Sequence, residues 1–277
     1  MRRILLWVLA ISLGTALPGL GQTIEEIRIN GSGTALDLLK PLAEAYQRKH
    51  PQVRIAIEKP LGSSGAIKAL LAGALDLALS SKPLTAEEAG RGARLQGYGR
   101  TPLAIVAEKS IPLSDFTTQQ LEDLYAGRLT QWKPGSPVRL VLRPQSDIDT
   151  QILRSLSPGL NQAVTLAHGR PGMLMAVTDP EAMALIARTQ GGVGASGLAS
   201  LLVEKPPLQV LTLNGVRPTT ATLASGTYPL AKEISVVTTA KTTPAAWAFI
   251  DFIYSAAGRA QAEKVGVLVT GSSAPSR

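Results

Sequence analysis

The first hundred residues alternate between segments with strand-like and helix-like spacing of hydrophobic positions. Apolar and polar residues alternate at 27–29 and again at 53–57, which predicts two strands. Between them, residues 35–50 carry apolar side chains every three or four positions, a spacing that predicts a helix. A second helix is expected to end at Gly73, and the apolar run 75–79 predicts a third, buried strand.

This succession is typical of a βαβαβ unit, in which parallel strands are joined by right-handed helical crossovers. The carboxyl ends of such strands meet at one edge of the sheet, beside the N-termini of the following helices. Loops rich in Ser or Gly follow all three predicted strands, at 30–34, 60–65 and 80–81. The pattern therefore predicts an α/β fold with a small-ligand site at this edge.

The rest of the chain continues the alternation, and its 277 residues are enough for two lobes of ordinary size. The hydrophobic pattern predicts helices at 118–124, 150–156 and 244–264, and strands at 138–142, 192–194 and 234–237.

The N-terminus has the three parts of a secretory signal peptide. Arg2 and Arg3 precede an apolar run at 4–17, which is too short to span a membrane as a helix. The small residues Gly19 and Gly21 suit a signal-peptidase site before Gln22. We expect residues 1–21 to be removed and the mature protein to be periplasmic or secreted, with an uncleaved membrane anchor as the alternative.

Composition narrows the classes of function. Only 4% of the residues are aromatic, which leaves little material for stacking on bases, so we expect no nucleic-acid partner. The formal net charge of +8 is spread along the chain and would attract an anionic ligand. The chain has no Cys and two His, which excludes disulfides and thiolate chemistry. A Ser-His triad would rest on His168 alone, so we expect no enzyme. With two His and no Cys we also expect no metal site, and we expect no cofactor.

The loops at the predicted sheet edge have the chemistry of an oxyanion site. Helix N-termini offer free N–H groups and the favourable end of the helix dipole, Ser and Thr add hydroxyl donors, and Gly permits close approach. An alternative is that these hydroxyls only cap the helices. The candidate donors in these loops are Ser32, Gly33, Thr34, Ser63, Ser64, Gly65 and Ser81.

A charged partner for an oxyanion is also expected. Arg143 follows the predicted strand 138–142, and a guanidinium offers bidentate geometry to a phosphate group. The segment after it leads into a helix and contains the polar residues Ser146, Asp149 and Thr150. The alternative is a surface arginine at the end of a strand.

Several segments together resemble the periplasmic phosphate-binding proteins of ABC transporters. The most specific similarity runs from Gly62 to Leu84, and weaker motifs continue in order to about Gly266. The resemblance implies two α/β lobes joined by a two-strand hinge, 23–103 plus 231–277 and 104–230, with the ligand between them. It also implies ligand contacts from Thr34, Ala35, Leu36, Ser63 or Ser64, Ser81, Arg143 and Thr150.

Two departures from the family pattern leave the choice of oxyanion open. Ser81 stands where the family usually has Asp. The family's Ser-Gly-Thr after the arginine is altered to Asp147-Ile148-Asp149-Thr150, with one extra residue after the arginine. Asp147 or Asp149 could replace the missing acceptor, or the two carboxylates could repel a dianion. We expect a monomeric binding protein that delivers phosphate to an ABC-transporter permease. The alternatives are a binding protein for sulfate, molybdate or tungstate, or an anion sensor.

Overall fold

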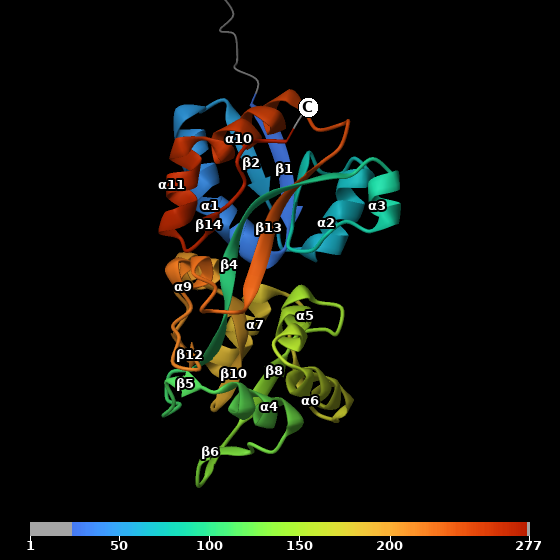
Figure 1. Ribbon diagram of the computed structural model, residues 1–277. Helices are drawn as coiled ribbons and strands as arrows, with labels where there is room; N and C mark the ends of the chain where they lie inside the picture. The colour runs from blue at the N-terminus through green and yellow to red at the C-terminus, as the bar shows by residue number, and fades with distance from the viewer. Residues whose placement is uncertain (1–23, 276–277) are drawn as a thin grey trace, which may run out of the picture.

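The computed structural model describes residues 24–275 and consists of two α/β lobes stacked end to end (Figure 1). The predicted signal peptide, 1–21, lies outside the described residues. Among the helices of 24–275, none is both long and apolar enough to cross a membrane.

The upper lobe in Figure 1 begins with the predicted βαβαβ unit. Its elements are β1 (Glu25–Gly31), α1 (Gly33–Lys49), β2 (Val53–Ile57), α2 (Gly62–Leu71) and β3 (Leu77–Ser80). β1 lies between β2 and β3 and pairs with both in parallel, which confirms the predicted parallel sheet. Helix α2 begins inside the predicted turn 60–65, at Gly62, whose φ of 71° favours glycine.

Two long strands join the lobes. β4 (Arg94–Glu108) pairs antiparallel with β13 (Ala231–Thr238) along its first part and with β10 (Gly192–Gly197) along its last part. The path of hydrogen-bonded strands is β2-β1-β3-β13-β4-β10-β8-β9, with β8 at Arg139–Leu142 and β9 at Leu174–Met175. β4 and β13 therefore run from one lobe into the other (Figure 1).

Helices cover the sheet in both lobes. The helices not yet named are α3 (Ala86–Gly90), α4 (Thr118–Ala126), α5 (Ile148–Ser155), α6 (Pro158–Gly169), α7 (Asp179–Arg188), α8 (Leu198–Glu204), α9 (Thr220–Ala224), α10 (Pro244–Tyr254) and α11 (Ala256–Lys264). The remaining strands are β5 (Asp115–Phe116), β6 (Gln131–Lys133), β7 (Ser136–Pro137), β11 (Leu208–Val210), β12 (Thr212–Leu213) and β14 (Leu268–Val269).

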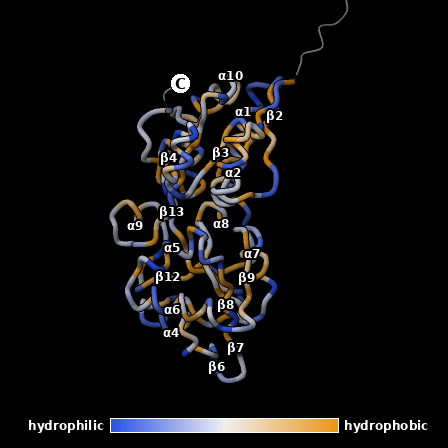
Figure 2. Tube along the Cα trace, turned by 90° about the vertical axis from the view of Figure 1, so that its right-hand side faces the viewer, coloured by the Kyte–Doolittle hydropathy of each residue, from blue (hydrophilic) through white to orange (hydrophobic). Residues whose placement is uncertain are grey.

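Each lobe has its own hydrophobic core, and apolar segments occur in both halves of the tube in Figure 2. Leu36 and Phe249 belong to the upper core, and Leu121 and Val164 to the lower one. Ala199 of α8 packs in the upper core although it lies within 104–230. The lobe boundaries 23–103 plus 231–277 and 104–230 stay a prediction.

The prediction of one long helix over 244–264 was wrong. The chain forms α10 and α11, and Ser255 between them has an extended backbone. The Ser255 hydroxyl accepts a hydrogen bond from the Gly258 N–H and so caps a new helix. The hydrophobic spacing alone did not reveal this interruption, because both helices turn an apolar face to the same lobe.

Candidate functional site

A cleft of about 400 Å³ lies between the two lobes. The upper lobe contributes backbone-rich segments from the starts of α1 and α2, and the lower lobe contributes the loop after β8 and the start of α7. The polar residues in its wall include Ser32, Gly33, Ser63, Ser64, Lys82, Arg143, Ser146, Asp147, Thr178, Asp179 and Lys232.

Four helices point their N-termini at this cleft: α1 and α2 from the upper lobe, and α5 and α7 from the lower. In the lower lobe these ends already carry acidic residues, with Asp147 as the N-cap of α5 and Asp179 as the first residue of α7. The first turns of α1 and α2 contain no acidic residue. The helices that bring no acidic residue of their own to the cleft are therefore those of the upper lobe.

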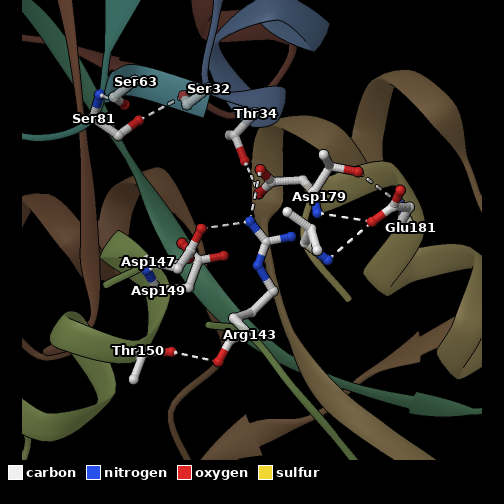
Figure 3. A network of polar contacts seen from close by, with 12 residues as sticks. Ser32, Thr34, Ser63, Ser81, Arg143, Asp147, Asp149, Thr150, Asp179 and Glu181 are labelled. Carbon is white, nitrogen blue, oxygen red and sulfur yellow. Dashed lines mark hydrogen bonds and ion pairs between the residues drawn. The ribbon is translucent and has the colours of Figure 1, made fainter. Parts of the chain in front are cut away.

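The alternative that Ser and Thr merely cap these two helices is wrong. Neither α1 nor α2 has a side-chain cap. The Ser32 hydroxyl instead lies 2.8 Å from the Ser81 hydroxyl, and the Ser63 hydroxyl accepts a 3.0 Å hydrogen bond from the Ser81 N–H (Figure 3). These serines tie the three loops of the sheet edge together, and the hydroxyls at the starts of both helices do not cap the N–H groups of their own helix.

Arg143 reaches the cleft from the carboxyl end of β8 and is 7% exposed. Its Nη2 donates to Asp147 Oδ2 over 2.6 Å and lies 3.7 Å from Asp179 Oδ2 (Figure 3). Within the described residues, its Nε and Nη1 have no hydrogen-bond acceptor. Burial alone would lower the pKa of Arg143, but the nearby carboxylates, above all Asp179, raise it, so the guanidinium is charged.

A buried cation from β13 completes the charge arrangement. Lys232 Nζ lies 2.7 Å from Asp149 Oδ1 and 2.6 Å from Asp179 Oδ1, and all three side chains are at most 3% exposed. Burial raises the pKa of Asp149 to about 6. Burial would also raise the pKa of Asp179, but Lys232 and Arg143 hold it below its usual range. Asp179 is therefore the firmly ionised member of the pair.

The structure brings half of the predicted site residues into the wall of the cleft and leaves the other half outside its lining. Ser32, Gly33, Ser63, Ser64, Arg143 and Ser146 line the cleft. The residues outside this lining are Thr34, Ala35, Gly65, Ser81, Asp149 and Thr150.

Most of the residues outside the lining are buried and contact other parts of the structure. Thr34 donates to Asp179, and Thr150 donates to the main-chain oxygen of Arg143 over 3.2 Å. Ala35 packs in the upper core. A direct ligand contact by the Asp149 carboxylate has no support in this arrangement, because that carboxylate is buried against Lys232.

Sequence reasoning missed Asp179 and Lys232. A signal for Lys232 was present in the alternation of its strand. Lys232 is on the same face as Ile234 and Val236, which is buried, and a buried lysine needs an acidic partner. Asp179 had only the signal of a helix start, in Thr178-Asp179-Pro180-Glu181. Its position in the cleft follows from the packing of the two lobes.

Metal ligation has no support from the geometry. Within residues 24–275, no group of three or more acidic or histidine side chains is arranged to hold a metal ion. The cleft instead gathers the cationic side chains Lys82, Arg143 and Lys232 beside the starts of α1 and α2, which is the chemistry of anion binding.

Comparison with known proteins places this arrangement among binding proteins. A family model described as a PBP superfamily domain matches residues 18–257. The phosphate-binding protein PstS of Borreliella burgdorferi is 24% identical over 97% of this chain and 99% of its own length. Protein SphX of Synechococcus elongatus is 26% identical over 86% of this chain and 75% of its own length.

The fold comparison agrees with the family match. A candidate phosphate ABC-transporter substrate-binding protein of Clostridium perfringens, solved with bound phosphate, superposes with a TM-score of 0.75 at 21% identity. The superposition covers 89% of this chain and 100% of that one. At this identity the similarity establishes the shared fold.

Proposed function

This chain belongs to the PBP superfamily, and from that premise we propose that it captures inorganic phosphate between its lobes for uptake by an ABC transporter. The relatives named as phosphate-binding proteins support this choice of ligand. So does the cleft, in which helix starts without a side-chain cap and a buried guanidinium converge from opposite lobes. The proposal includes an extracytoplasmic location and a permease in the membrane as the partner that receives the ligand.

The observation that carries the proposal is the buried guanidinium of Arg143. This side chain is charged and 7% exposed, and its Nε and Nη1 have no acceptor among residues 24–275. Burying such donors costs free energy unless another acceptor bonds to them. A tetrahedral oxyanion that bridged Arg143 and the starts of α1 and α2 would supply acceptors to both lobes at once. Binding would then favour the closed arrangement of the lobes through contacts that only that arrangement offers.

The cleft also contains an acceptor suited to an oxyanion that carries a proton. Asp147 lines the cleft with an 18% exposed side chain, and each of its oxygens can accept a further hydrogen bond. Hydrogen phosphate can donate to such a carboxylate, whereas sulfate, which has no proton near neutral pH, would be repelled by it. This difference supports phosphate over sulfate despite Ser81 in the place of an acidic residue.

Calorimetric titration of the purified mature protein with phosphate, sulfate, molybdate and tungstate tests the proposal. We expect phosphate to bind and excess sulfate not to displace it. Arg143→Met should weaken phosphate binding by at least about thirtyfold, because removing one partner of a buried charge pair costs about 2–5 kcal/mol. Arg139→Met is the matched control, since Arg139 is exposed at the opposite end of the same strand. Absence of heat with every oxyanion, or equal effects of the two variants, would refute the proposal.

A further inference from the structure

The Asp179 carboxylate lies where a ligand oxyanion would be expected to meet the donors of the upper lobe. It belongs to the lower lobe, at the first position of α7, yet its Oδ1 accepts a 2.8 Å hydrogen bond from the Thr34 hydroxyl of α1 (Figure 3). Its other oxygen is so close to the start of α1 that a Cβ added to Gly33 would lie 2.7 Å from Oδ2. A side chain of one lobe thus holds an anionic group against the helix end of the other.

The same carboxylate also engages the cations of the cleft. Lys232 Nζ donates to Oδ1 over 2.6 Å, and Arg143 Nη2 lies 3.7 Å from Oδ2. Asp179 is 3% exposed, so little solvent screens these interactions. Its neighbours are therefore a hydroxyl, a lysine and an arginine, at a position beside the start of α1, and these are groups that a free oxyanion would use.

We propose that Asp179 sets the affinity of this site, as a tethered carboxylate that competes with the ligand for the Thr34 hydroxyl and the N-terminus of α1. The inference rests on the proposed function, since it requires an oxyanion in the cleft. An incoming oxyanion must displace the carboxylate from these donors or share them with it. Either way, part of the binding free energy offsets the loss of contacts that the protein already makes.

Asp149 offers a matched control inside the same cluster. It pairs with the same lysine and carries the same charge, but it does not line the cleft and, within residues 24–275, makes no hydrogen bond to Thr34 or Gly33. Asp149→Asn therefore changes the charge of the cluster by the same amount as Asp179→Asn. Only the second variant removes the group that competes for the upper-lobe donors.

The experiment is a calorimetric titration of wild type, Asp179→Asn and Asp149→Asn with inorganic phosphate near pH 7.5. We expect Asp179→Asn to lower the Kd about tenfold or more, and Asp149→Asn to change it by less than about threefold. Thermal unfolding without phosphate checks that each variant is folded. Asp179→Ser, which also removes the charge and suits a helix start, should tighten binding likewise and replaces Asp179→Asn if that variant fails to fold.

The outcomes separate this inference from the proposed function. Weaker or unchanged binding by the folded Asp179 variant overturns the competition and assigns the carboxylate to ligand binding or to structure. Equal tightening by both variants overturns it too, because charge alone would then explain the gain. Absence of phosphate binding by the wild type overturns the proposed function and this inference together. Binding by the wild type without tightening in the variant overturns the inference alone.

Discussion

Replacing Lys232 by methionine would leave two buried carboxylates without the cation that they share. Lys232 is on β13, one of the two strands that join the lobes, and its side chain is 1% exposed. Methionine has a similar length and fills the space of the aliphatic stem, so the change removes charge with little change in packing volume. Asp149 and Asp179 would then be buried with Arg143 as their nearest remaining cation.

The two ion pairs set the size of the effect. At an effective dielectric constant of about 20, Coulomb's law gives roughly 6 kcal/mol for each pair at these separations. Desolvation of three charges opposes most of this attraction, and removing one partner of a buried ion pair costs about 3–5 kcal/mol net. Since about 1 kcal/mol shifts the Tm of a chain of this size by roughly 2–4 °C, we expect the Tm to fall by about 6–20 °C.

Calorimetric melting of ligand-free protein at pH 7.5 measures this change. Arg128→Met is the control, because Arg128 pairs with Asp123 over 2.6 Å but is 59% exposed, and exposed pairs contribute about 0–1 kcal/mol. Adding Asp149→Asn to Lys232→Met should restore part of the lost stability by removing one orphaned charge. A loss below about 1 kcal/mol for Lys232→Met, or no recovery in the double variant, would show that the cluster is not held by charge pairing.

Two further predictions concern pH and backbone packing. Burial raises the pKa of Asp149 to about 6, so the folded state disfavours the ionised form of this group and binds its proton more tightly than the unfolded chain does. The stability of Asp149→Asn relative to wild type should therefore be highest above pH 7. Urea unfolding should show this difference in unfolding free energy shrinking as the pH falls from 7 to 5. A difference that grows instead would contradict the raised pKa of Asp149. Separately, Gly31→Ala should destabilise the protein by about 1–3 kcal/mol, because its Cβ would lie 2.5 Å from the main-chain oxygen of Leu79. Gly90→Ala should instead stabilise the protein by up to about 1 kcal/mol, because the added Cβ would meet nothing within 4 Å and the backbone at Gly90 is helical. Equal shifts of the urea midpoint in the Gly31 and Gly90 variants would contradict this difference.

The local order of elements could be predicted from the sequence because local spacing determines it. Alternation at 53–57 and helical spacing over 35–50 correspond to β2 and α1, since each periodicity reflects one buried face. The donor loops could be predicted for the same reason: they follow the strands directly, and a parallel sheet brings the carboxyl ends of its strands to one edge. Arg143 was predicted in this way from the end of β8.

Pairings between distant segments could not be predicted from local spacing. Thr34 and Asp179 are separated by 145 positions, and Lys232 reaches Asp149 and Asp179 only because β13 passes between the lobes. Hydrophobic periodicity identifies which face of an element is buried, but it carries no information about which buried face of another element lies opposite. The sequence by itself therefore determined the α/β elements, the donor-rich loops and the position of Lys232 on the buried face of its strand. The tertiary structure alone decided that Ser and Thr leave α1 and α2 uncapped and that Asp179 lies against the start of α1, because these depend on how two separately packed cores fit together.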